Sequence, residues 1–140
     1  MLRRLFAVLL VALSLSACDS SGPTECAEGD TCYTYLATDP SGVSAVTGSF
    51  SLSEEAGQIT GLWRTQRIGG SDVGPQVGSG ELVGQEEGDR VVLTLVSNVA
   101  TGTVELIGVR GEGRITGQWT WLPPTGGVRS GTFDLFATGD

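Results

Sequence analysis

The chain has 140 residues, which is enough for one domain with one hydrophobic core. It is acidic, with 8 basic residues against 16 acidic ones and a net charge of −8. This balance repels nucleic acid, so we expect no nucleic-acid partner. The basic residues are all arginine and no histidine occurs, so the commonest general base and the lysine amine are both missing. We therefore expect a protein that is not an enzyme and that carries no cofactor.

Residues 1–17 have the layout of a secretory signal peptide. Arg3 and Arg4 precede an apolar run over residues 5–15. That run is too short to span a bilayer comfortably, which argues against an uncleaved membrane helix. It ends in Leu15-Ser16-Ala17-Cys18, which resembles the lipobox of bacterial lipoproteins. A leader for soluble secretion is the alternative.

The lipobox resemblance implies cleavage before Cys18, a diacylglycerol on its sulfur and an acyl chain such as palmitate on its amino group. Several acyl chains, at about 0.8 kcal/mol per buried methylene, hold a protein stably on a membrane. We therefore expect a lipid-anchored protein of the bacterial cell envelope, with the membrane as a partner. Asp19 resembles an inner-membrane retention signal, but this sorting rule varies among bacteria, so inner membrane, outer membrane and cell surface stay open.

The mature chain begins with residues 18–31, which are the lipidated cysteine and a flexible tether rich in Ser, Gly and Pro. Two arginines leave with the signal, so six arginines face 16 acidic residues, a net charge of −10. With Cys18 acylated, Cys26 and Cys32 remain, and an oxidising envelope favours a disulfide between them. A metal site is the alternative, but two thiols without any histidine are a poor ligand set. We expect the disulfide and no metal.

Residues 32–140 alternate between apolar and polar with period two, and no window shows a helical stripe. Clusters of Gly, Pro, Asp and Ser separate the strand-like runs. The spacing predicts an all-β domain, an eight-stranded antiparallel up-and-down barrel whose first and last strands pair, which removes exposed edges. The expected strands cover residues 32–37, 46–53, 58–66, 78–84, 90–96, 103–109, 114–121 and 130–137.

Two short motifs recur along these strands. Ile59-Thr60-Gly61-Leu62-Trp63 returns as Ile115-Thr116-Gly117-Gln118-Trp119. The second motif is a glycine with apolar or glycine residues at alternate positions after it. Because the spacing varies, the repeated unit is a hairpin of variable loop length and not a solenoid of fixed period. The glycine motifs are Gly48-x-Phe50-x-Leu52, Gly80-x-Leu82-x-Gly84, Gly102-x-Val104-x-Leu106 and Gly131-x-Phe133-x-Leu135.

Alternation assigns the two faces of the sheet. Three apolar residues, Leu62, Ile107 and Phe136, break the pattern and should lie outside. They form either a patch for another protein or scattered exposed residues. The side chains expected inside are Phe50, Leu52, Ile59, Trp63, Leu82, Val91, Leu93, Leu95, Val104, Leu106, Ile115, Trp119, Phe133 and Leu135. Those expected outside are Thr47, Ser49, Ser51, Thr60, Arg64, Glu81, Glu105, Thr116, Gln118, Thr120, Thr132 and Asp134.

Loop lengths distinguish the two ends of the expected barrel. The connections after the second, fourth and sixth strands are short and acidic, whereas the others are mostly long and rich in Gly and Pro. The first strand starts at the short-turn end, so the tether and lipid belong there. The loop-rich end then faces away from the membrane, and loops tend to carry function.

The expected barrel is similar to the avidin and lipocalin-like group of small up-and-down barrels. The segments Ile59-Thr60-Gly61-Leu62-Trp63 and Thr116-Gly117-Gln118-Trp119 resemble strands of avidin-type barrels. The resemblance covers residues 32–138 by architecture. Strand one offers Cys32-Tyr33-Thr34-Tyr35 where avidins begin with Gly-x-Trp, and the family's biotin contacts have no counterpart here, so biotin binding is not implied.

The candidate site residues are aromatic. Eight expected inward positions are glycine, which would leave room for a small apolar or aromatic-stacking ligand in the barrel. The alternative is that glycine permits tight coiling of the sheet and the rings fill the gaps, leaving a solid core. The candidate ligand-binding residues are Trp63, Trp119, Trp121, Tyr33, Phe50 and Phe133. The glycines are Gly48, Gly61, Gly80, Gly84, Gly102, Gly108, Gly117 and Gly131.

Three classes of function follow. The first is a lipid-anchored binding module for a small molecule at the loop-rich end. The second is a structural or protein-interaction component of the envelope with a solid core and an outer apolar patch. The third is a hydrolase, suggested by the adjacent pairs Glu54-Glu55 and Glu86-Glu87. Both pairs belong to tight turns, where solvated acids are ordinary, and two carboxylates would have to converge inside the mouth. We expect no catalytic residues.

Overall fold

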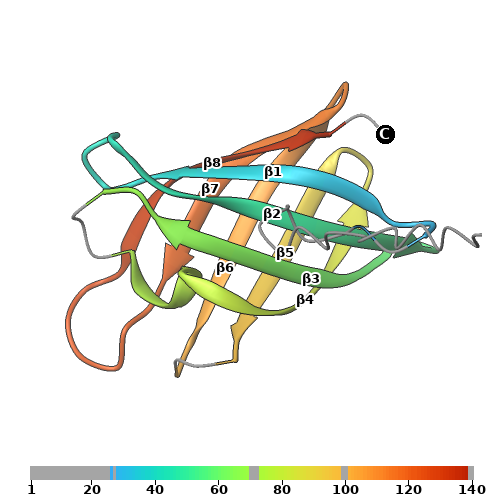
Figure 1. Ribbon diagram of the computed structural model, residues 1–140. Coiled ribbons are helices and arrows are strands. Elements are labelled where there is room, and N and C mark those ends of the chain that lie inside the picture. The colour runs from blue at the N-terminus through green and yellow to red at the C-terminus, as the bar shows by residue number, and fades with distance from the viewer. Residues whose placement is uncertain (1–25, 27, 70–72, 99–100, 139–140) are drawn as a thin grey trace, which may run out of the picture.

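A computed structural model describes residues 26, 28–69, 73–98 and 101–138. The expected signal peptide, Cys18 and the tether up to residue 25 lie outside the described residues. The described chain is a closed barrel of eight antiparallel strands in sequence order, which confirms the predicted all-β meander (Figure 1). Its strands are β1 Thr31–Thr38, β2 Ser44–Glu55, β3 Gln58–Arg67, β4 Gly78–Glu87, β5 Arg90–Ser97, β6 Thr103–Gly111, β7 Arg114–Trp121 and β8 Arg129–Ala137, and one short 3₁₀ helix, η1 Gly74–Gln76, precedes β4.

The barrel closes between its first and last strands. β1 pairs with β8 over five residues, from Tyr33 opposite Ala137 to Ala37 opposite Phe133. Every other pair is a sequential hairpin, so no strand edge is left open. Figure 1 shows the short turns gathered at one end and most of the longer connections toward the other. Among the described residues no helix has the length and apolar character to cross a bilayer.

Alternation places the core as expected. All fourteen side chains predicted to point inward are at most 2 % exposed. Tyr35 and Ala37 join them on the inner face of β1. One predicted outward residue, Ser51, is buried instead. The predicted orientation is right and the predicted exposure to water is wrong: Ser51 faces outward, but a segment before β1 covers it.

That segment holds the end of the tether against the barrel. Cys26 and Cys32 form the predicted disulfide, with 5.7 Å between their Cα atoms. Ser51 Oγ donates a hydrogen bond of 2.7 Å to the Asp30 carboxylate. The tether residues nearest the barrel are therefore fixed on β2, close to the short-turn end where the sequence predicted that the tether leaves.

Glycines let the sheet coil tightly, which is the alternative that the sequence left open. A side chain at Gly80 would overlap the Val96 carbonyl oxygen of the neighbouring strand. Gly131 is equally crowded, since an added Cβ would lie 2.6 Å from Trp119 Nε1. Gly102 is the exception among the predicted inward glycines: it lies in the connection before β6 with a φ of +103°, so its role is a turn.

Candidate functional site

The barrel interior is occupied by aromatic rings. Tyr35 stacks on Phe50 with 4.6 Å between ring centroids, and the Tyr35–Phe133 distance is 6.2 Å. Trp63 and Trp119 are 2 % and 0 % exposed. Tyr35, absent from the candidate set, therefore stacks between two of its members, Phe50 and Phe133.

The two tryptophans of the repeated motif have the same environment. Trp63 is opposite Gly80 in the β3–β4 pair, and its indole donates a 3.0 Å hydrogen bond to the Glu81 carbonyl. Trp119 is opposite Gly131 in the β7–β8 pair, and its indole donates a 2.7 Å bond to the Thr38 carbonyl. Each ring thus covers a glycine and satisfies its own N–H with backbone. Both indole N–H groups therefore form hydrogen bonds that stabilise the barrel.

Residues 73–77, the described end of the β3–β4 connection that contains η1, close the loop-rich mouth. Gln76 of η1 is 0 % exposed and accepts a 2.8 Å hydrogen bond from the Tyr35 hydroxyl. The side-chain amide nitrogen of Gln76 donates a 2.8 Å hydrogen bond to the Val73 carbonyl, and the backbone carbonyl of Gln76 accepts a hydrogen bond from Thr65 Oγ1. Burial raises the pKa of Tyr35 strongly, because the ionised phenol would lie in an apolar interior. The alternation of the strands does not predict this inward segment, although the apolar residues Val73 and Val77 are a signal for it.

The remaining two candidate residues lie away from the interior ring cluster. Trp121 is half-buried at the loop-rich end, where its ring packs so closely on Gly74 that a side chain there would overlap it. Its indole nitrogen is buried and has no hydrogen-bond partner among the described residues. Tyr33 is inside the barrel at the opposite end, where its hydroxyl accepts a 3.0 Å hydrogen bond from Arg110. The structure therefore does not bring all six candidates together.

Arg110 closes the short-turn end. Its guanidinium bonds Glu86 at 2.6 Å, the Glu54 carboxylate and the Tyr33 hydroxyl, so it joins β1, β2, β4 and β6. Desolvation lowers the pKa of Arg110, but the hydrogen bonds to Tyr33 and Glu86 outweigh it and raise that pKa overall. The two carboxylates thus converge at the end opposite the mouth on a shared cation, which offsets one of their two negative charges.

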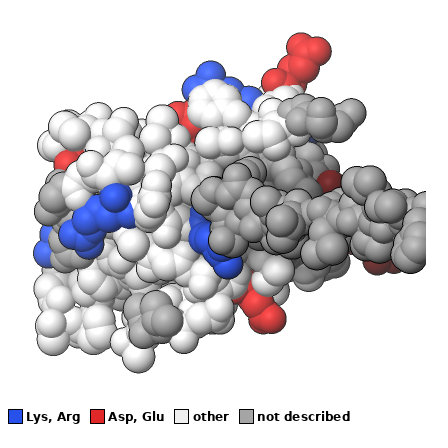
Figure 2. Space-filling view, viewed as in Figure 1, with Lys and Arg blue, Asp and Glu red and all other residues white. Residues whose placement is uncertain are grey.

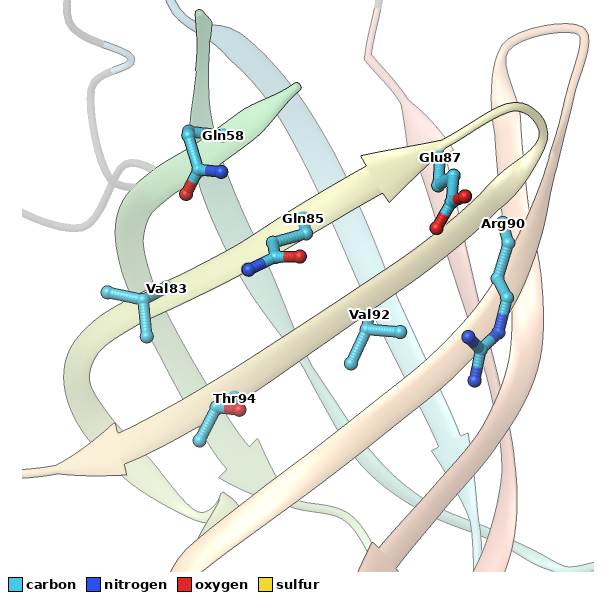
Figure 3. A pocket seen from close by; sticks show the side chains of 8 residues that line it. Gln58, Val83, Gln85, Glu87, Arg90, Val92 and Thr94 are labelled. Atoms are coloured by element: carbon cyan, nitrogen blue, oxygen red, sulfur yellow. The ribbon is translucent and has the colours of Figure 1, made fainter. Parts of the chain in front are cut away.

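One cavity lined by described residues lies outside the barrel. It is a groove of about 480 Å³ on the outer face of β3, β4 and β5. Figure 3 shows side chains from all three strands projecting from this face of the sheet. The lining pairs two amides directly across the β3–β4 ladder, since Gln58 is opposite Gln85. Its residues are Gln58, Val83, Gly84, Gln85, Glu87, Arg90, Val92 and Thr94.

An apolar face adjoins the groove. Val92 is directly opposite Ile107, and Val83 and Val109 lie on the diagonals beside it. Val83 and Val109 are 53 % and 58 % exposed. We call these four residues the outer apolar face. The sequence pattern could have found it, because the parity that puts Leu82 and Gly108 inside puts Val83 and Val109 outside.

The three apolar residues predicted to lie outside are exposed but do not form one patch. Ile107 belongs to the outer apolar face. Leu62 on β3 is opposite Glu81, and the Arg114 guanidinium lies 4.8 Å from the ring centroid of Phe136 on β8. Much of the surface in Figure 2 is uncharged, with isolated arginines and acidic residues. Within the described part of the chain no group of His, Cys, Asp and Glu side chains is arranged to hold a metal ion.

Comparison with protein-family models, with curated proteins and with solved structures gives no match for this chain.

Proposed function

We propose that the chain is a lipid-anchored protein of a bacterial cell envelope whose barrel is a non-enzymatic recognition module, and that it binds a protein partner on its outer surface. The observation that carries the proposal is the contrast between the two sides of the sheet. The inside is packed with rings and closed by Gln76 at one end and Arg110 at the other. The outside carries a groove and an exposed apolar face.

The anchor is proposed from the lipobox-like sequence before Cys18 and from the position of the tether. The disulfide-closed segment meets the barrel at the short-turn end. A membrane at that end leaves the sides of the barrel accessible. Replacing Cys18 by Ala should abolish incorporation of a labelled fatty acid and release the protein from the membrane fraction. Retention of the label in the Cys18→Ala variant would contradict the lipid anchor.

The binding surface is tested by photo-crosslinking in cells. A photoreactive amino acid at Val92 of the full chain should give a discrete adduct, because Val92 lies in both the groove and the outer apolar face. The matched control is Thr34, an exposed residue on β1, the strand diametrically opposite β5 in a barrel of eight. A second substitution, Ile107→Asp, should remove the Val92 adduct. Equal adducts from both positions, or none from Val92, would refute the surface.

A small ligand at the loop-rich end is the second candidate, and one observation favours it. Trp121 is half-buried there and its indole N–H has no acceptor among the described residues. The probe 8-anilinonaphthalene-1-sulfonate should bind and raise the melting temperature if an apolar site is present, since a ligand of the native state stabilises it. A Trp121→Phe variant should then lose that shift. No binding of the probe counts against this candidate.

A further inference from the structure

From the outer apolar face we infer that the partner is a second copy of this chain, which binds side by side with the tethers of both copies at the same end. This inference rests on the proposed function and names the partner of the same surface. It is argued from the charges around the outer apolar face and from the position of the tether.

The charges beside the outer apolar face are of both signs. Glu87 and Arg90 are directly opposite one another across the β4–β5 ladder, and Arg90 is also opposite Val109. Both are exposed, and neither forms an ion pair among the described residues. The Glu87–Arg90 pair can complement itself, because a two-fold axis brings each group near its opposite in the other copy, and the turn residue Asp89 adds a second exposed acid beside Arg90.

The same two charges explain where two acidic molecules can meet. The chain has a net charge of −8, so copies repel one another over most of their surfaces. Around the β4–β5 hairpin Arg90 offsets one of the two exposed acidic residues, Glu87 and Asp89, so the repulsion is reduced there, and the outer apolar face begins beside Arg90 at Val109. Apolar burial drives association there, and opposite charges set the orientation.

The tether selects one arrangement of the two-fold axis. An axis along the barrel keeps the short-turn ends of both copies on one side, where the Cys26–Cys32 segment joins the barrel. Both lipids then reach the same membrane. An axis across the barrel would place the tethers at opposite ends and is incompatible with a shared membrane. With the axis along the barrel and passing the hairpin, Arg90 of each copy lies close to Glu87 of the other.

The first test is the mass of the Val92 photo-adduct in the full, lipidated chain. An adduct of twice the chain mass supports the second copy. An adduct of another mass overturns the second copy and leaves the proposed binding surface standing. Absence of any Val92 adduct overturns both.

The second test reverses the two charges and measures the dimer fraction by sedimentation in detergent. Glu87→Arg alone and Arg90→Glu alone place like charges together and should each weaken the dimer by about tenfold or more. The double variant restores opposite charges and should recover it. Glu112→Arg, the same charge change in the β6–β7 turn, is the control and should leave the dimer fraction close to that of the wild type. Failure of the double variant to recover the dimer, with its melting temperature unchanged, refutes the pairing.

Discussion

A single buried hydroxyl connects the core to the segment that closes the mouth. Tyr35 is fully buried, and its hydroxyl donates to the Gln76 side chain, which itself has no exposed surface. The folded state therefore binds the Tyr35 proton more tightly than the unfolded chain does, and the pKa of Tyr35 is raised by burial. This makes the stability of the protein depend on pH in the alkaline range.

The sign of that dependence follows from proton binding. Above pH 10 the unfolded chain loses the Tyr35 proton and the folded chain keeps it, so stability falls as pH rises, by up to about 1.4 kcal/mol per pH unit. Tyr35→Phe removes this loss but costs about 1–2 kcal/mol near neutral pH, because Gln76 loses its donor. The wild type should therefore be the more stable at pH 8, and its advantage should shrink between pH 10 and 11.

Urea unfolding of both proteins at several pH values measures this difference. Tyr33 is common to both and cancels in the comparison. An advantage of the wild type that stays constant from pH 8 to pH 11 would show that Tyr35 is accessible to solvent in the folded state.

At the scale of residues, the sequence predicted which face a side chain occupies but not which side chains meet across the chain. Phe50 and Trp119 were placed inside because alternation is a local property. Ser51 lies on the predicted outer face but is shielded from water, because Asp30, 21 residues away in the sequence, covers it. The six candidate site residues share the inner face of the sheet, but Tyr33 and Trp121 lie at opposite ends of the barrel. Alternation does not predict this separation, because it gives no position along the barrel axis.

At the scale of elements, the turn between β2 and β3 carries the one non-glycine residue with positive φ among the described residues. Glu55 pairs with Gln58 across the two-residue turn Ala56-Gly57, where φ is +51° and +80°. Two positive φ values in a two-residue hairpin are typical of a type I′ turn, which prefers Asn-Gly. Alanine in the left-handed region costs about 1 kcal/mol, whereas asparagine tolerates it.

Ala56→Asn should therefore stabilise the protein by about 0.5–1 kcal/mol and raise the melting temperature by roughly 2–6 °C. Ala56 is exposed, so no packing is lost. Calorimetry of the two proteins measures the change. Gly57→Ala in the same turn is the opposing control and should destabilise, because its φ is also positive and an added Cβ would lie 3.3 Å from the Glu86 carbonyl oxygen. A lower melting temperature for Ala56→Asn would contradict the assigned turn type.

The strands were predictable to within a few residues because period two is strong in all eight of them. The inward course of residues 73–77 was not, because a segment held by tertiary contacts has no periodicity. Its path is set by tertiary contacts, from Gln76 to Tyr35 and to Thr65, on strands separated in the sequence. Composition predicts a Gly-rich loop, and only the buried hydrogen bonds of Gln76 reveal that the described end of this loop closes the mouth.

At the scale of the whole molecule, the predicted pairing of the first and last strands is confirmed, and it follows from counting strands and loops. The filled interior was one of two alternatives, because inward glycine fits both a cavity and a tight coil. The distance between neighbouring strands decides between a cavity and a filled interior, and the sequence does not give that distance. At Gly80 and Gly131 the neighbouring backbone takes the space that a side chain would need.

The attachment of the tether to the barrel gives a prediction about the molecule as a whole. The Cys26–Cys32 bond closes a loop with a sequence separation of 6, which in the chain-entropy view contributes roughly 2 kcal/mol. The paired variant Cys26→Ser with Cys32→Ser should lower the free energy of unfolding by about that amount. It should also expose Ser51, since Cys26 and Asp30 would no longer be held on β2.

Guanidinium unfolding gives the first quantity, and amide hydrogen exchange of β2 against β6 gives the second. Ser51→Ala is the matched control: it removes the hydrogen bond to Asp30 but keeps the disulfide, so it should cost about 1 kcal/mol and leave exchange in β2 close to the wild type. If the paired cysteine variant matched the wild type in both measurements, the disulfide would not fix the tether. The barrel would then be free to turn relative to its anchor, and the shared membrane would no longer select a two-fold axis along the barrel.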